Sequence, residues 1–128
     1  MDEGEQRAMI LEFEKNRQML GNVNAQKQQV TYQLEMVDAS LEELAKTKEK
    51  TVFKVVGNVL FPKDAKEMEK ELKDKKESTD LRLKTLAKQE EVLLKKLNTA
   101  RAKLEAQMKG AKSEDADESE EKNEKKRK

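Results

Sequence analysis

The side chains that could do chemistry in this chain are carboxylates, lysines, hydroxyls and the phenol of Tyr32, because the sequence contains no histidine and no cysteine. An enzyme needs a nucleophile, a base or a metal held in a pocket. The carboxylates instead recur four residues before lysines, as in Glu42 with Lys46 and Glu71 with Lys75. Such pairs are typical of a solvated helix surface. We therefore expect no enzyme, no catalytic residue, no metal site and no cofactor.

Composition also restricts the partners and the compartment. Lys and Arg number 28 against 27 Asp and Glu, and only 3% of residues are aromatic, so a nucleic-acid-binding helical arm is disfavoured. No apolar run approaches the roughly 18 residues of a membrane span, and the N-terminal MDEGEQR is too acidic for a signal peptide. The lack of cysteine permits a reducing cytosol. We expect a cytoplasmic protein with neither nucleic acid nor membrane as partner.

Two segments carry a heptad pattern that predicts long helices, the first at about residues 5–50 and the second after Pro62. The first seam consists of Met9, Phe13, Asn16, Leu20, Val23, Lys27, Val30, Leu34, Val37, Leu41 and Leu44. The second consists of Leu72, Lys76, Thr79, Leu83, Leu86, Glu90, Leu93, Leu97, Ala100, Leu104 and Gln107. Sixteen of these 22 positions are apolar. We therefore expect the segments to pair as an antiparallel coiled coil.

Two polar features bear on the coiled coil. Asp64 followed by Glu67 resembles a capping box and predicts the start of the second helix. Lys27 and Glu90 fall within about one layer of each other when the chain folds back, and could form an ion pair that sets register. The sequence leaves equally open that both side chains extend separately into water.

Between the helical segments lies TVFKVVGNVLFP, residues 51–62, which predicts a β-hairpin. Gly57-Asn58 forms a two-residue turn with glycine first. The expected register places Val56 opposite Val59, Lys54 opposite Phe61 and Val55 opposite Leu60, so both faces are largely apolar. Two lone strands are marginally stable in water. We expect an oligomerisation hairpin of Val52, Phe53, Val55, Val56, Gly57, Asn58, Val59, Leu60 and Phe61 that joins a barrel or sandwich of hairpins from several chains. The alternative is a hairpin that folds down over its own coiled coil.

A second apolar surface is expected where the first helix begins and the second helix ends. Ile10 and Leu11 lie off the seam, beside seam residues of the same end. We predict an apolar tip for contact with non-native chains, made of Met9, Ile10, Leu11, Phe13, Leu104 and Met108. Met and Leu side chains adapt to irregular apolar partners. The sequence leaves open that these residues only close the last layer of the coil.

The C-terminal segment changes character. From Lys112 the chain has six acidic residues between Glu114 and Glu121, followed by the basic end Lys125 to Lys128. We expect residues 5–110 to form the coiled-coil domain with its hairpin, and residues 111–128 to be a disordered charged tail. Such a tail can either keep the protein in solution or dock onto a charged partner.

Taken together, these features resemble the beta class of prefoldin. The resemblance rests on the central VFKVVGNVL (residues 52–60), on QKQQV (26–30) in the first helix, and on KQEE (88–91) with Leu97 in the second. It covers roughly residues 5–110, and a single hairpin separates the beta class from the alpha class. The charged tail departs from the family pattern.

The resemblance implies an ATP-independent co-chaperone. The family builds a hexamer of two alpha-class and four beta-class subunits, in which the hairpins form a double β-barrel platform and six coiled coils extend from it. Non-native client proteins are held at the coiled-coil tips and passed to a group II chaperonin. The competing interpretation is a coiled-coil scaffold or tether that has no affinity for unfolded chains.

Overall fold

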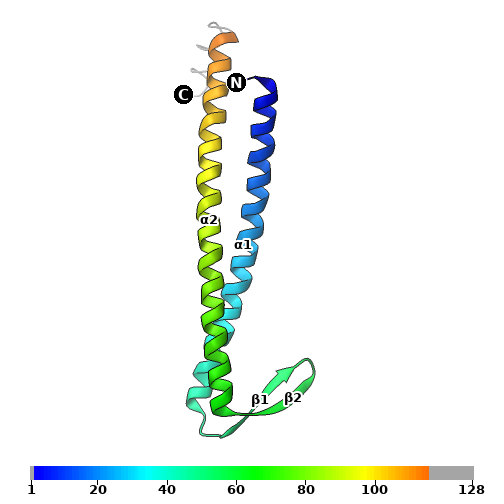
Figure 1. Ribbon diagram of the computed structural model, residues 1–128, viewed down its shortest axis with the longest axis vertical. Coiled ribbons are helices and arrows are strands. Elements are labelled where there is room, and N and C mark those ends of the chain that lie inside the picture. The colour runs from blue at the N-terminus through cyan, green and yellow to red at the C-terminus, as the bar shows by residue number, and fades with distance from the viewer. Residues whose placement is uncertain (1, 116–128) are drawn as a thin grey trace, which may run out of the picture. The chain divides into compact units, whose positions relative to one another are not determined.

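The computed structural model describes residues 2–115, in which two helices flank one β-hairpin (Figure 1). Helix α1 spans Glu3–Lys46, strand β1 Thr51–Val56, strand β2 Val59–Asp64 and helix α2 Ala65–Asp115. The predicted fold class, mainly α with a single hairpin between the helices, is confirmed. Neither helix, within these residues, has a stretch long and apolar enough to cross a membrane.

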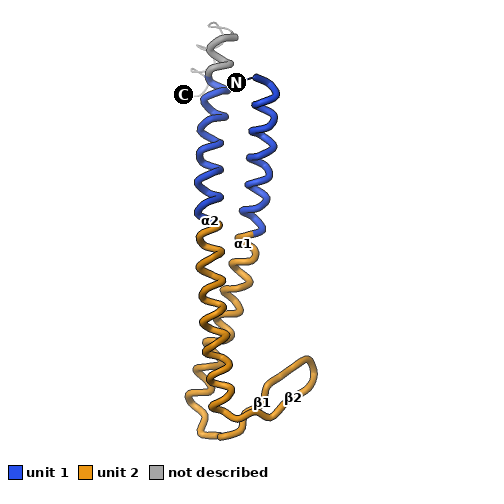
Figure 2. The backbone as a smooth tube through the Cα atoms, viewed as in Figure 1, with its two compact units in different colours: residues 1–22, 90–128 blue, residues 23–89 orange. Residues whose placement is uncertain are grey.

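The chain divides into two compact units (Figure 2). The first comprises Met1–Asn22 and Glu90–Lys128, so it pairs the beginning of α1 with the later part of α2. The second, Val23–Gln89, pairs the remaining parts of the helices and carries the hairpin. Each unit therefore has its own segment of the coiled-coil seam.

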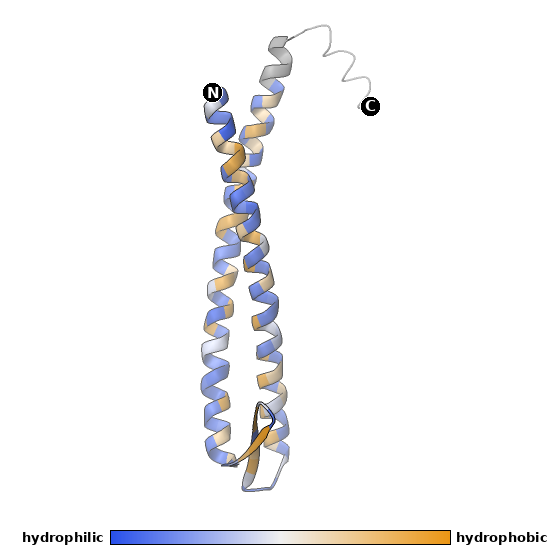
Figure 3. Cartoon of the chain, turned by 90° about the vertical axis from the view of Figure 1, so that its right-hand side faces the viewer, coloured by the Kyte–Doolittle hydropathy of each residue, from blue (hydrophilic) through white to orange (hydrophobic). Residues whose placement is uncertain are grey.

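The heptad seam predicted from the sequence is confirmed in both units, because all 22 of its positions are buried or partly buried. In the second unit the most buried apolar residues are Val23, Val30, Val37, Leu72 and Leu86. In the first unit they are Leu93 and Leu97. Figure 3 shows the apolar residues recurring at intervals along both helices. The core is thus a narrow seam, and none of the described side chains falls below 2% exposure.

Helix α1 begins and ends at residues that satisfy its terminal backbone groups. Asp2 caps its start, because the Glu5 N–H donates to Asp2 Oδ1 at 2.7 Å. The helix ends at Lys46, whereas the heptad pattern predicted an end near Lys50. The Glu49 N–H donates to Thr47 Oγ1 at 3.3 Å, a local bond that competes with continued helix. The predicted end was therefore wrong by about one turn.

The start of α2 matches the predicted capping box. The Glu67 N–H donates to Asp64 Oδ2 at 3.3 Å, and the Ala65 N–H donates to the Lys50 carbonyl at 2.8 Å. The second bond ties the chain entering the hairpin to the chain leaving it. Asp64 therefore ends β2 and caps α2 at once, which leaves no loop between them.

The hairpin has the register that the sequence predicts, with Val56 opposite Val59, Lys54 opposite Phe61 and Val55 opposite Leu60. Gly57 has a φ of +61°, and Asn58 has a negative φ, a combination typical of a type II′ turn. The strands continue to Thr51 opposite Asp64, so the hairpin covers residues 51–64 rather than 51–62. Pro62 is tolerated because a two-stranded sheet has only edge strands.

Two predictions are left open. Helix α2 includes the beginning of the predicted tail, and residues 116–128 of that tail lie outside the described residues. The ion pair between Lys27 and Glu90 also stays a prediction.

Candidate functional site

The hairpin exposes a large apolar surface. Its register places Val52, Lys54, Val56, Val59, Phe61 and Lys63 on one face, and Phe53, Val55, Leu60 and Pro62 on the other. Between 49% and 67% of the surface of each of six large side chains is open to solvent: Phe53, Val55, Val56, Val59, Leu60 and Phe61. In Figure 1 the hairpin projects sideways from the end of the helices. The alternative of a hairpin folded over its own coiled coil is therefore wrong.

One carboxylate ties the base of this hairpin to α2. Lys54 of β1 donates to Glu71 Oε1, and Lys63 of β2 donates to Glu71 Oε2. Hydrogen bonds from Lys54 and then from Lys63 lower the pKa of the Glu71 carboxyl to about 2. Because the two lysines come from different strands, the carboxylate restrains both strands against the helix. Val52, on the same face, is partly buried.

The Glu71 bridge differs from the pairing that the sequence predicts. The i,i+4 spacing paired Glu71 with Lys75 on a solvated helix face, but the carboxylate turns instead toward lysines 17 and 8 residues earlier. The other such pair is confirmed, with Lys46 Nζ 3.7 Å from Glu42 Oε1. Nothing in the local spacing of Glu71 distinguishes the two cases. The available signal was the strand register, which places Lys54 and Lys63 on the same face of the hairpin.

A second ion pair joins the helices of the second unit and was also missed. Lys76 Nζ lies 2.8 Å from Asp38 Oδ1, and this hydrogen bond raises the pKa of Lys76. Lys76 occupies a seam position that seemed a mere interruption of the heptads. The side chain leaves the seam to reach a carboxylate on the neighbouring helix, and so the pair helps to set register.

The predicted client-binding tip residues all belong to the first unit. The structure separates them into two kinds. Ile10, Leu11 and Met108 are exposed at 50%, 70% and 64%. Met9, Phe13 and Leu104 are half-buried seam residues. We define the exposed trio as the tip patch, since only these side chains are largely available to a partner without opening the seam.

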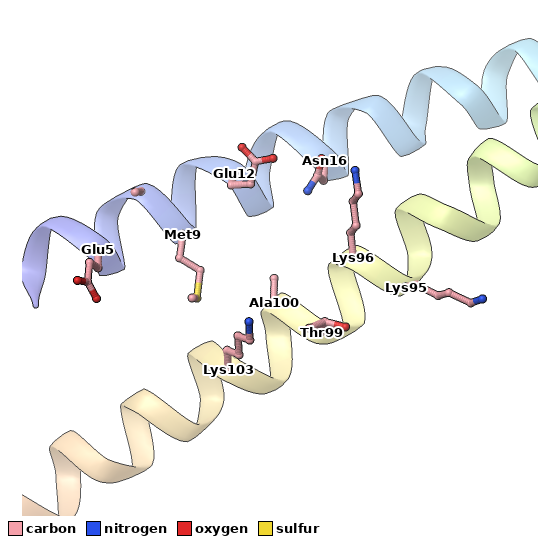
Figure 4. A pocket seen from close by; sticks show the side chains of 10 residues that line it. Glu5, Met9, Glu12, Asn16, Lys95, Lys96, Thr99, Ala100 and Lys103 are labelled. Carbon is pink, nitrogen blue, oxygen red and sulfur yellow. The ribbon is translucent and has the colours of Figure 1, made fainter. Parts of the chain in front are cut away.

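A groove that was not predicted from the sequence lies between α1 and α2 in the first unit (Figure 4). Its lining comes from Glu5, Ala8, Met9, Glu12 and Asn16 of α1 and from Lys95, Lys96, Thr99, Ala100 and Lys103 of α2. The small side chains of Ala8 and Ala100 leave space beside the half-buried Met9. Alanine at a seam position was the signal in the sequence, because it fills less of the layer than leucine does.

The described residues 2–115 contain no group of three or more His, Cys, Asp or Glu side chains placed to hold a metal ion. The surface features of the described residues are an apolar hairpin with open strand edges, the tip patch and the groove. Together with the paired helices, they define the class of coiled-coil proteins that carry a β-hairpin between their helices.

Comparison with known proteins narrows that class. The family model described as prefoldin subunit matches residues 7–111, so the chain belongs to the prefoldin subunit family. Prefoldin subunit beta of Saccharolobus islandicus is 35% identical over 101 residues, which cover 78% of this chain and 80% of the relative. Prefoldin subunit beta of Archaeoglobus fulgidus is 36% identical over 98 residues, covering 76% and 84%.

A solved structure supports the same assignment. The crystal structure of the prefoldin beta subunit from Thermococcus strain KS-1 aligns with a TM-score of 0.70 and 31% sequence identity. The alignment covers 78% of this chain and 89% of that chain. The single hairpin between two helices is the beta-type fold, and the predicted family resemblance is confirmed.

Proposed function

We propose that this chain is a beta-type subunit of an ATP-independent prefoldin co-chaperone in the cytoplasm. Its hairpin would join hairpins of alpha-class subunits and of further beta-class copies in a complex of two plus four chains. Its coiled-coil tip would hold non-native proteins and deliver them to a group II chaperonin. The observation that carries the proposal is the exposure of six large apolar side chains on a two-stranded hairpin.

The physical argument begins with the hairpin. Two strands with apolar residues on both faces bury too little surface to be stable without neighbours. Their unpaired edges can accept further strands by backbone hydrogen bonding. Phe53, Val55 and Leu60 face one way and Val56, Val59 and Phe61 the other, so burial of both faces requires additional sheets. A barrel of several hairpins provides both the edges and the faces.

The tip patch supports the client-holding part of the proposal. Each exposed apolar side chain contributes about 1.5–3 kcal/mol when it is fully buried by a partner, before the entropic cost of association. One tip therefore binds weakly and releases readily. Several tips carried by one complex raise the effective concentration, so that weak contacts add up to useful retention.

Assembly is tested by native mass spectrometry after mixing the chain with an alpha-class prefoldin subunit. We expect a complex of two alpha-class and four beta-type chains. The double variant Phe53→Ser, Leu60→Ser should fail to assemble, because it removes two side chains exposed by 64% and 61%. The matched control is Tyr32→Ser, Met36→Ser on α1, where the exposures are 62% and 51%. Assembly of the hairpin variant at the wild-type level would contradict the proposal.

Client holding is tested by suppression of aggregation of a denatured protein. The variant Ile10→Ser, Leu11→Ser should suppress aggregation less well while its oligomer stays intact. Leu81→Ser, at a residue 59% exposed in the second unit, is the control. A scaffold without affinity for unfolded chains would bind a native protein as well as a denatured one, and that result would favour the competing interpretation.

A further inference from the structure

The groove between α1 and α2 in the first unit has walls of different charge. Its lining includes Glu5 and Glu12 from α1, and three lysines, Lys95, Lys96 and Lys103, from α2. Its apolar lining residues are Ala8, Met9 and Ala100, which we call the floor of the groove. A segment that enters this groove therefore meets both apolar and charged side chains.

The side chains that face inward are fewer than those that line the groove. Figure 4 shows Lys96 and Lys103 of α2 extending into the space between the helices, with Ala100 between them. From α1, Met9 and Glu5 point into the same space, whereas Glu12 and Lys95 point away at the rim. Lys95 is also paired with Glu91 at 3.4 Å. The interior of the groove thus carries more positive than negative charge.

The two inward lysines are seven residues apart on one helix, or roughly 10 Å along its axis. Ala100 lies between them, and Met9 of α1 lies across the groove from Lys103. A bound segment can therefore place one large apolar side chain on the floor while a carboxylate on either side of it meets a lysine. A basic segment with the same apolar residue would bring its charges against Lys96 and Lys103 instead.

We infer that this groove selects, among client segments, those in which a large apolar side chain is flanked by carboxylates. The inference rests on the proposed client-holding function and adds a chemical preference to it. Recognition combines apolar contact with Met9 and Ala100 and ion pairing with Lys96 and Lys103. It predicts that acidic amphipathic segments are held more tightly than basic ones of equal hydrophobicity.

By its sequence, the chain's own C-terminal segment matches the groove less well than such a client segment. Residues 116–128 read ADESEEKNEKKRK, which supplies carboxylates for the lysines but no apolar side chain larger than alanine. It can therefore pair with the lysines of the groove but offers no large apolar side chain to its floor. A client segment that carries Leu, Phe or Met beside its carboxylates matches both, so we expect it to bind in preference to this segment.

The test uses two labelled peptides that share the same Leu and Phe positions, one with Glu and the other with Lys at the flanking positions. Binding to the full chain, assembled with an alpha-class prefoldin subunit, is measured by fluorescence anisotropy. We expect the acidic peptide to bind about 3- to 10-fold more tightly, from two partly exposed ion pairs. The preference should shrink as salt is raised from 50 to 300 mM, because salt screens exposed pairs.

The deciding variant is Lys96→Glu, Lys103→Glu, which should abolish or invert the preference. The matched control is Lys84→Glu, Lys88→Glu, which makes the same change in net charge at exposed positions outside the groove and should leave the preference unchanged. Equal binding of both peptides to the wild type would overturn the inference, and so would an equal effect of the two variants. A chain lacking residues 116–128 that binds the acidic peptide at least tenfold more tightly would also overturn it, since the tail would then be the occupant.

Failure of the proposed function gives a different result. In that case neither peptide binds and aggregation of a denatured protein is not suppressed. If both peptides bind with equal affinity and aggregation is suppressed, only the charge preference is lost.

Discussion

Lys54 on β1 donates a hydrogen bond to Glu71 on α2, and this bond links the hairpin to a helix that begins only after the hairpin ends. Lys63 on β2 reaches the other oxygen of the same carboxylate. The hairpin is therefore restrained at its base, while the apolar residues beyond it remain exposed. A hairpin that is already restrained loses less conformational entropy if it assembles with other chains.

Replacing this carboxylate should loosen the base of the hairpin. In Glu71→Gln we expect faster hydrogen exchange at the backbone of β1 and β2, with helical content close to that of the wild type. The reason is that a neutral amide has one acceptor oxygen and no charge, so it binds two ammonium groups more weakly than a carboxylate does. Glu42→Gln, in an exposed pair with Lys46, is the control. Unchanged exchange in the hairpin would show that the bridge restrains nothing.

The same bridge predicts a dependence on acid. The pKa of Glu71 is lowered from 4.5 to about 2 in the folded chain, so folding favours the charged form. Its stabilising contribution is complete above the unfolded pKa and is lost as the pH falls from about 4.5 to about 2. We expect the difference in stability between wild type and Glu71→Gln to be constant near neutral pH and to vanish toward pH 2. Urea unfolding at a series of pH values measures this, and a difference that persists at pH 2 would contradict it.

Neighbouring leucines in α2 test where the core of the first unit lies. Leu93 is 5% exposed, and Leu94 is 43% exposed. Leu93→Ala should lower the free energy of unfolding by about 2–3 kcal/mol, because it removes buried methyl groups and leaves a cavity in the seam. Leu94→Ala should change it by about 0.5 kcal/mol or less. Chemical denaturation followed by circular dichroism distinguishes the two variants. Equal destabilisation by both would contradict the assignment of Leu93, rather than Leu94, to the seam.

Two glycines should respond to alanine in opposite directions. Gly57 has a φ of +61°, and a Cβ there would meet no atom within 4 Å, so the penalty is backbone strain alone. Gly57→Ala should cost about 1–2 kcal/mol at the turn. Gly21 lies within α1, also with nothing within 4 Å of an added Cβ, and Gly21→Ala should stabilise by about 0.5–1 kcal/mol. Thermal unfolding and assembly yield report these effects, and a stabilising Gly57→Ala would rule out the type II′ turn.

The elements themselves could be predicted from local patterns. Every seam position that the heptad spacing predicted is buried or partly buried. A helical period of 3.6 residues brings those side chains to one side whatever the partner. The Gly57-Asn58 turn determined the strand register, since a two-residue loop leaves only one pairing of Val56. The end of α1 was misjudged because the bond from Glu49 to Thr47 competes with helix over a few residues, where the heptad pattern carries no information.

By itself, then, the sequence determined two helices, their shared seam and a hairpin in register, since all of these follow from the repeat of side chains along a chain segment. Only the tertiary structure decided that Glu71 turns to Lys54 and Lys63 rather than to Lys75, and that Lys76 leaves the seam for Asp38. It alone showed that Ala8 and Ala100 leave a groove with charged walls. The physical reason is that long side chains choose partners by distance in space, and the distances between separate elements depend on how those elements pack.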